Sequence, residues 1–288
     1  MKFQKNISLA KHTTFKIGGP AKYFCIAESK EDIIEAIKKA KEKKLPLFIL
    51  GNGSNVLALD EGFDGLVIKI ETRSLSTDRD RVSAEAGAKL KDLLRLSARE
   101  GLTGLEWIAG IPGTVGGAIY GNAQAFDGKM SNLIKSVEVL DDRSLKIKKI
   151  SQKKCQFSLK SSVFKRNKNL IIASAVLKLK KGNKKEIKNK IKENLAWRKK
   201  RHPLNYPSAG SVFINRSKKF PSAYLIEQSG LKGRRVGDAQ VSKKHAGFII
   251  NLGKAKAKDV LELIKIIKKE VKKKFRIKLE EEIQIVLR

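Results

Sequence analysis

The chain of 288 residues has little cysteine, few aromatic residues and no long apolar run. Its two cysteines, Cys25 and Cys155, are too few for a disulfide framework and lack the spacing of metal ligands. No apolar run approaches the roughly 18 residues that a membrane helix needs. The first residues contain no apolar segment typical of a signal peptide. Together these absences favour a cytoplasmic protein with no metal site and no membrane insertion.

Acidic residues are scarce beside basic ones. The 63 Lys and Arg against 29 Asp and Glu give a formal net charge of +34. One interpretation is a protein that binds nucleic acid or another anionic polymer. The lysines are, however, spread over the whole chain, and aromatic residues make up only 6%. We therefore favour a generally basic surface with no specific nucleic-acid partner, which suits anionic small molecules equally well.

The apolar content of 41% is enough to bury cores, and the length favours two or three lobes. Apolar periodicity predicts helices over residues 31–44, 89–100, 183–200, near 221–229, and 258–274. It predicts strands over residues 45–50, 66–70, 81–86, 137–141, 146–150, 170–179 and 277–287. Helices and strands alternate without a regular βαβ period, which predicts an α+β fold.

Two glycine-rich loops stand out. The first, Gly51-Asn52-Gly53-Ser54-Asn55, directly follows a predicted strand. Its backbone N–H groups could form a nest for phosphate oxygens, and a purely structural turn is an equal alternative. The second, Ile111-Pro112-Gly113-Thr114-Val115-Gly116-Gly117, lies in a nearly uncharged stretch of a chain that is 32% charged. This pattern predicts packing against a planar cofactor with a diphosphate tail or, alternatively, against another domain.

Motifs along nearly the whole chain resemble one known family, the UDP-N-acetylenolpyruvoylglucosamine reductases (MurB), in the shorter type without a tyrosine-bearing loop. The matching blocks occur in the family's order. They are Thr13–Ala21, Gly51–Asn55, Gly104–Gly117 followed by Asn122-Ala123, Pro207–Phe213, Leu225–Gly233, Gly237–Ser242, His245–Phe248 and Leu279–Ile283.

The resemblance implies a two-lobed FAD-binding fold of the vanillyl-alcohol-oxidase (PCMH) type. It implies a first FAD lobe over residues 1–70, completed by the C-terminal strand 279–288, a second lobe over 71–195, and an α/β substrate-binding domain over 196–278. The implied cofactors are FAD and NADPH, and the implied state is a cytoplasmic monomer. The implied FAD contacts are Gly51, Asn52, Gly53, Ser54, Asn55, Ala86, Gly87, Ile111, Pro112, Gly113, Thr114, Gly116 and Gly117.

The same resemblance implies a reaction in peptidoglycan precursor synthesis. NADPH reduces FAD, and the reduced flavin passes hydride to C3 of the enolpyruvyl group of UDP-N-acetylenolpyruvoylglucosamine. Ser211 matches the family serine that protonates C2, and Glu282 matches the catalytic glutamate. Asn215 and Arg201 match substrate-binding positions, the latter near the diphosphate.

The third catalytic position departs from the family pattern Phe-x-Tyr-Arg-x-Ser-x-Phe. This chain has Phe157-Ser158-Leu159-Lys160-Ser161-Ser162-Val163-Phe164, so that Lys160 replaces the arginine. Because arginine grips a carboxylate with two hydrogen bonds and lysine offers a point charge, we expect Lys160 to neutralise the enolate with looser geometry. A further departure is Arg216, where the family usually has proline.

These departures leave alternatives open. One is a catalytically weakened family member, and another is a basic protein that binds anions or nucleic acid. A third is an FAD oxidase of the same fold, but this alternative does not explain the Ser211 and Glu282 motifs.

Overall fold

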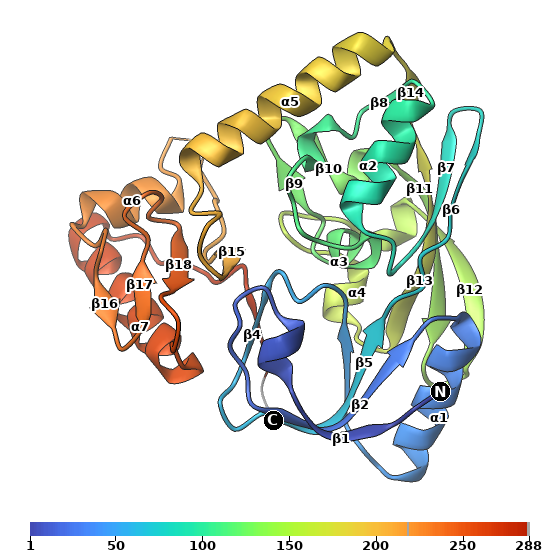
Figure 1. Ribbon diagram of the computed structural model, residues 1–288, viewed down its shortest axis with the longest axis horizontal. Helices are drawn as coiled ribbons and strands as arrows, with labels where there is room; N and C mark the ends of the chain where they lie inside the picture. The colour runs from blue at the N-terminus through green and yellow to red at the C-terminus, as the bar shows by residue number, and fades with distance from the viewer. Residues whose placement is uncertain (218, 287–288) are drawn as a thin grey trace. The chain divides into compact units, whose positions relative to one another are not determined.

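The computed structural model describes residues 1–217 and 219–286 (Figure 1), and the chain forms two compact units. Unit 1 comprises Met1–Lys2, Cys25–Asn52 and Ile68–Arg198. Unit 2 comprises Phe3–Phe24, Gly53–Val67 and Lys199–Arg288. Each unit therefore collects stretches that lie far apart in the sequence. The predicted division into three lobes stays a prediction.

Unit 1 contains a five-stranded antiparallel sheet of order β12-β11-β13-β7-β6. Alternate residues of β13, such as Ala175 and Leu177, are buried, as expected for a strand with one covered face. The short helix α3 packs against β13 and β7. The strands are β6 (Leu75–Asp78), β7 (Arg81–Glu85), β11 (Ile134–Asp141), β12 (Lys146–Ser151) and β13 (Leu170–Lys178).

Three helices of unit 1, namely α1, α2 and α5, form where the sequence predicts them, over residues 31–44, 89–100 and 183–200. Helix α1 starts with a capping box in which Ser29 and Asp32 satisfy each other's backbone N–H groups. Helix α2 is followed by Gly101, whose φ of +69° is the left-handed conformation that ends helices. The helices are α1 (Lys30–Glu42), α2 (Leu90–Arg99), α3 (Val115–Tyr120), α4 (Val163–Arg166) and α5 (Lys184–Arg201), the last of which runs into unit 2.

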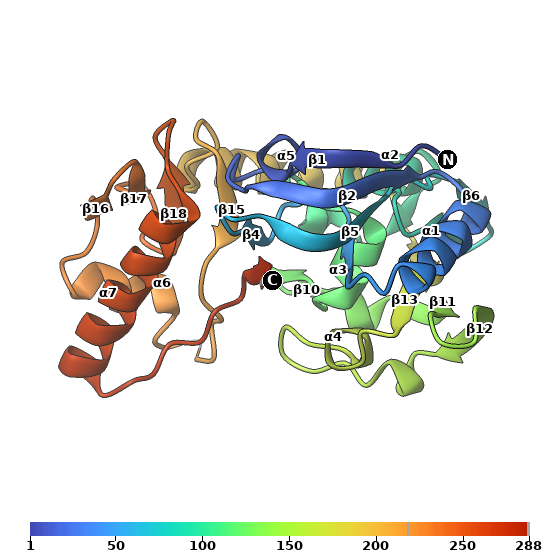
Figure 2. The ribbon, with the colours of Figure 1, turned by 90° about the horizontal axis from the view of Figure 1, so that it is seen from below.

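A second sheet has the order β1-β2-β5-β3, and Figure 2 shows β1, β2 and β5 side by side. The strands are β1 (Gln4–Ser8), β2 (Pro20–Ala27), β3 (Leu47–Leu50) and β5 (Phe63–Ile70). The described residues also form three two-stranded sheets. These pair β4 (Val56–Ala58) with β19 (Gln284–Val286), β8 (Leu102–Thr103) with β14 (Lys180–Lys181), and β9 (Gln124–Ala125) with β10 (Gly128–Lys129).

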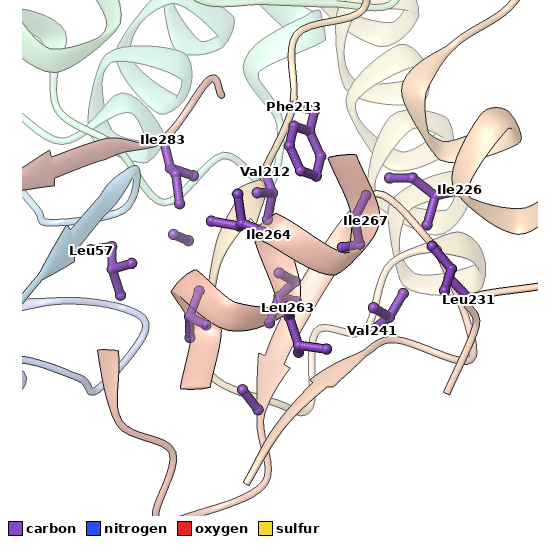
Figure 3. Close-up of a cluster of buried hydrophobic side chains, with 14 of the residues drawn as sticks. Leu57, Val212, Phe213, Ile226, Leu231, Val241, Leu263, Ile264, Ile267 and Ile283 are labelled. Atoms are coloured by element: carbon purple, nitrogen blue, oxygen red, sulfur yellow. The ribbon is translucent and has the colours of Figure 1, made fainter. Parts of the chain in front are cut away.

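In unit 2, α7 packs against β16 and β17 of a four-stranded sheet of order β15-β18-β17-β16, and α6 packs against α7. The apolar face of α7 supplies Val260, Leu263, Ile264 and Ile267 to one buried cluster, and Figure 3 shows Val212 of that cluster beside Ile264. The elements are β15 (Ser208–Ser211), β16 (Arg235–Val236), β17 (Ala239–Val241), β18 (Phe248–Asn251), α6 (Ser222–Gln228) and α7 (Ala257–Phe275).

The prediction of an α+β fold is confirmed, but two local predictions are wrong. Over residues 277–286, the strand predicted for 277–287 is β19 alone, with an isolated bridge at Glu281; residue 287 lies outside the described residues. The segment changes partner near Ile283, because residues 280–282 pair with 212–214 and β19 pairs with β4. The stretch around Gly116, which showed no helical period, contains α3, whose six residues are too few for periodicity to reveal.

Candidate functional site

In unit 1, the first glycine loop leaves β3 and touches the second. The Asn52 side-chain amide donates a hydrogen bond to the Pro112 carbonyl oxygen. A Cβ added at Gly51 would lie only 2.6 Å from the Thr114 hydroxyl, so a larger residue at Gly51 would push the loops apart. Two loops separated by about 60 residues in the sequence are therefore in contact in the fold.

The second glycine loop also packs against the segment after β7. The Gly116 N–H donates to the Ala86 carbonyl oxygen at 2.8 Å, and the Val115 N–H donates to Ala88 at 2.9 Å. A Cβ added at Gly87 would lie 2.5 Å from the Thr72 carbonyl oxygen. Glycine at this position thus permits backbone contact that no side chain would allow. The structure brings the predicted Ala86 and Gly87 together with the loop that starts at Ile111.

These residues of unit 1 fit a dinucleotide with a diphosphate group. Segments 51–52, 86–87 and 111–117 contain no acidic side chain, so nothing in them repels phosphate. Several of their backbone N–H groups, such as those of Val115, Gly116 and Gly117, already bind protein oxygens. The Thr114 hydroxyl, which caps α3 by accepting from the Gly117 N–H at 3.3 Å, can still donate, and the Asn52 amide has a second N–H besides the one that binds Pro112. Neutral donors on glycine-rich backbone are the chemistry that phosphate oxygens require.

The remaining residues of the first glycine loop belong to unit 2. Gly53 has a φ of +63°, and a Cβ there would lie 2.3 Å from the His12 carbonyl oxygen. The Thr14 hydroxyl donates to the Ser208 carbonyl oxygen at 2.7 Å, and its N–H donates to Gly53 at 3.1 Å. Thr14 therefore ties Gly53 to the start of β15, the strand that ends at Ser211.

Ser211 follows a bulge in β15. Ser208 pairs with Ile250 and Ser211 pairs with Phe248, with a register shift between them. Gly210 has a φ of +77°, and a Cβ there would meet nothing within 4 Å. Glycine at 210 is thus required by backbone conformation rather than by space. The bulge determines the direction in which Ser211 points.

Glu282 lies on the chain segment that pairs with the residues after Ser211. Its N–H donates to the Val212 carbonyl oxygen at 2.7 Å, and its own carbonyl oxygen accepts from the Asn55 side chain at 3.1 Å. Unit 2 therefore brings together Asn55, the Ser211 strand end and Glu282, which come from three distant parts of the sequence.

The two neighbouring glutamates have other partners. Glu280 pairs with Arg216, and Glu281 pairs with Lys268 on α7 at 2.9 Å. Arg216, the family departure, therefore forms an ion pair with an exposed carboxylate beside the site. The side chain of Glu282 is half-buried, whereas that of Glu280 is exposed.

Lys160 lies in unit 1, at the tip of a two-residue turn. Ser158 and Ser161 exchange backbone hydrogen bonds of 3.0 and 3.3 Å on either side of Leu159 and Lys160. Lys160 has a φ of +52°, a left-handed conformation that non-glycine residues adopt at a cost. The direction of its side chain is thus set by the turn.

The two predicted substrate contacts lie in unit 2. Asn215 uses its side-chain oxygen to accept from the Ser222 N–H at 2.8 Å and the Ser222 hydroxyl at 2.7 Å, at the start of α6. Its position in the loop after Ser211 is therefore fixed by α6. Arg201 is the last residue of α5 and is exposed.

Asn122, to which the sequence alone gives no role, is only 4% exposed and lies beside the Lys160 turn. The signal was an asparagine just after a glycine at the end of a short uncharged segment, where a left-handed residue can end a helix. Its φ of +43° bears this out.

Among residues 1–217 and 219–286, no helix is long and apolar enough to span a membrane. No three histidine, cysteine, aspartate or glutamate side chains within the same described ranges cluster as metal ligands would.

Comparison with known proteins gives consistent matches over nearly the whole chain. The family model described as the C-terminal domain of UDP-N-acetylenolpyruvoylglucosamine reductase matches residues 202–286, and an FAD-binding domain model matches residues 21–148. The chain is 43% identical to the UDP-N-acetylenolpyruvoylglucosamine reductase of Clostridium novyi, with 98% of this chain and 92% of the relative covered. It is 42% identical to that of Caldanaerobacter subterraneus, with 99% and 94% covered.

Among solved structures, the chain is similar to the UDP-N-acetylenolpyruvylglucosamine reductase (MurB) of Thermus caldophilus. The TM-score is 0.84 at 35% identity, and the match covers 99% of each chain.

Proposed function

Because the chain belongs to the UDP-N-acetylenolpyruvoylglucosamine reductase family of FAD-dependent oxidoreductases, we propose that it performs this reduction with NADPH as electron donor. The substrate is UDP-N-acetylenolpyruvoylglucosamine and the product is UDP-N-acetylmuramate. We further propose that it acts in the cytoplasm as a monomer.

In unit 1, the glycine-rich segments 51–52, 86–87 and 111–117 would hold FAD, with its diphosphate near the Thr114 hydroxyl and the Asn52 amide. When bound, FAD would supply the hydride chemistry, by which a hydride from NADPH reaches C3 of the enolpyruvyl group. The chain's own task is to bind the substrate, stabilise the negative charge that develops toward its carboxylate, and deliver one proton to C2.

We assign the proton to the Ser211 hydroxyl. A serine hydroxyl is a weak acid, so it serves as a proton donor only where nearby groups stabilise its anion or replace its proton. The bulge at Gly210 supports this assignment, because it fixes Ser211 at a strand end rather than inside a regular ladder. Glu282, on the segment paired with Val212, would assist at the same centre.

We assign the cation that faces the enolate to Lys160. A point charge in a site with little water stabilises an oxyanion strongly, even without the paired hydrogen bonds of an arginine. Arg201 would bind the diphosphate of the substrate, and Asn215 would contact the sugar nucleotide through its side-chain amide.

The observation that carries the proposal is the pairing of residues 212–214 with 280–282, since it joins the predicted acid and the predicted carboxylate in one unit. The test is anaerobic. Purified protein should show a flavin spectrum that NADPH bleaches and that the enolpyruvyl UDP-sugar restores.

Each alternative predicts a different result. Restoration by oxygen but not by the UDP-sugar would favour an oxidase, and restoration at a greatly reduced rate would favour the weakened member. A colourless protein that binds nucleic acid in a salt-sensitive way would contradict the enzyme proposal.

A further inference from the structure

The two ends of α3 have different partners in unit 1. At its start, Thr114 and Gly116 belong to the glycine loop that contacts Ala86. At its end, Tyr120 and Asn122 reach the segment that carries Lys160. Because α3 has only six residues and packs against β13 and β7, its two ends keep a fixed separation.

Asn122 makes two hydrogen bonds that leave its own helix. Its side-chain nitrogen donates to the Ser158 carbonyl oxygen at 2.9 Å, at the base of the Lys160 turn. Its side-chain oxygen accepts from the Ser131 N–H at 3.0 Å. The Ser131 N–H thus fixes the orientation of the Asn122 amide, and the amide in turn binds the base of the Lys160 turn. Asparagine also tolerates the φ of +43° better than most residues do.

A second bond holds the other side of the same turn. The Ser162 hydroxyl, which is fully buried, donates to the Tyr120 carbonyl oxygen at 2.7 Å. The turn from Ser158 to Ser161 therefore lies between two anchors that both come from the end of α3. Neither bond is needed to form α3, whose C-terminal Gly121 N–H is already bound by the Gly117 carbonyl oxygen.

We propose that Asn122 is a positioning residue for Lys160. In this arrangement, α3 links the glycine loop that would hold FAD to the cation that faces the enolate. Asn122 fixes the turn, the left-handed turn fixes the direction of the Lys160 side chain, and Lys160 meets the developing charge. This inference rests on the proposed function. It adds a residue that acts through another and does not touch the substrate.

The test uses the holoenzyme with Asn122→Asp, which keeps size, left-handed tolerance and the acceptor for Ser131, and removes the donor to Ser158. Anaerobic rapid mixing times the two half-reactions separately. We expect the oxidation of reduced enzyme by the UDP-sugar to slow about 10- to 100-fold, as small displacements of a catalytic group do. We expect FAD affinity and reduction by NADPH to change less than about twofold.

A double-mutant cycle separates positioning from a general structural effect. In the Lys160→Ala background, Asn122→Asp should slow substrate reduction by no more than about twofold, because the group that it positions is gone. The matched control is Asn194→Asp, since Asn194 is also a buried amide of unit 1 that donates to a backbone carbonyl at 2.9 Å. It should affect both half-reactions alike or neither.

Several outcomes would overturn the proposal. These are additive effects in the cycle, equal slowing of both half-reactions, or an unchanged rate in Asn122→Asp. If that variant does not fold, Ser162→Ala removes the second anchor and must give the same selective pattern. If the wild-type enzyme is not reoxidised by the UDP-sugar, the proposed function fails instead. Hydrogen exchange at Ser158 to Ser161 in Asn122→Asp then tests the anchoring alone, and unchanged exchange refutes it.

Discussion

The backbone N–H of Glu282 donates to the carbonyl oxygen of Val212 at 2.7 Å, and this bond places the C-terminal glutamate beside the residue that follows Ser211. A second bond, from the Ile214 N–H to the Glu280 carbonyl oxygen at 2.9 Å, extends the pairing. The two segments are about 70 residues apart in the sequence. Their register decides which of the three consecutive glutamates pairs with Val212, the residue directly after Ser211.

The first prediction concerns that register. Glu282→Gln should slow oxidation of the reduced enzyme by the UDP-sugar about 10²- to 10⁴-fold, because a carboxylate that assists proton transfer is lost. Glu280→Gln is the matched control, since Glu280 is exposed and pairs with Arg216. It should leave the rate within about twofold. Anaerobic rapid mixing measures the oxidation rate of both variants. Equal rates in the two variants would contradict a catalytic role that is specific to Glu282.

The second prediction concerns the lysine that replaces the family arginine. Lys160→Arg should keep or raise the rate of substrate reduction, because arginine adds a second parallel hydrogen bond to a carboxylate. Lys160→Ala should lower that rate by at least about 10- to 150-fold, the cost of one charge-assisted bond in the transition state. Steady-state turnover with the UDP-sugar measures both variants. Unchanged turnover in Lys160→Ala would contradict the role.

The third prediction concerns the two thiols. Burial raises the pKa of Cys25 to about 12 and that of Cys155 to about 11. At pH 8, about one thiol in a thousand or fewer is then ionised in the folded protein, and both side chains are fully buried. A colorimetric thiol reagent should detect no rapid reaction in the native protein and two thiols after denaturation. Rapid modification of native protein would contradict the burial.

The fourth prediction concerns the pH dependence of stability in unit 1. Hydrogen bonds from Lys30 and then from Ser174 hold the pKa of Glu138 below its ordinary value of 4.5. A group with a lowered native pKa stabilises the fold above its ordinary value and loses that effect as pH falls through the native pKa. Because the pair is about one-third exposed, Glu138→Gln should lower the free energy of unfolding by only about 0.5 kcal/mol at pH 7.

Urea unfolding at a series of pH values tests this sign. The difference between the wild type and Glu138→Gln should shrink below pH 4.5 and vanish below the lowered native pKa. A difference that grows toward acid pH would contradict it. Glu186→Gln is a suitable control, because Glu186 is an exposed residue at the start of α5.

The sequence predicted those parts of the fold that depend on local pattern. Helices α1, α2 and α7 followed from apolar periodicity, capping and a terminal glycine, which are properties of residues close together in the chain. The two glycine loops were recognisable because glycine and the absence of charge are visible without any partner. Motif order was enough to identify the family, and the comparisons confirmed it.

Contacts between distant segments could not be predicted in this way. Periodicity suggested one strand over 277–287, whereas tertiary pairing bends the segment near Ile283 and gives its halves two different partners. The role of Asn122 could not be predicted for the same reason, because it depends on a hydrogen bond to Ser158, which lies 36 residues away in the sequence.

The sequence by itself thus determined which residue types are available for the chemistry: a serine after a glycine, a glutamate near the end, and a lysine in place of an arginine. Only the tertiary structure decided that Glu282 rather than Glu280 pairs with Val212, the residue after Ser211, and that the end of α3 anchors the turn of Lys160. The physical reason is that hydrogen bonds between segments fix register and direction, and a register shift of one residue would turn each of these side chains to the opposite face.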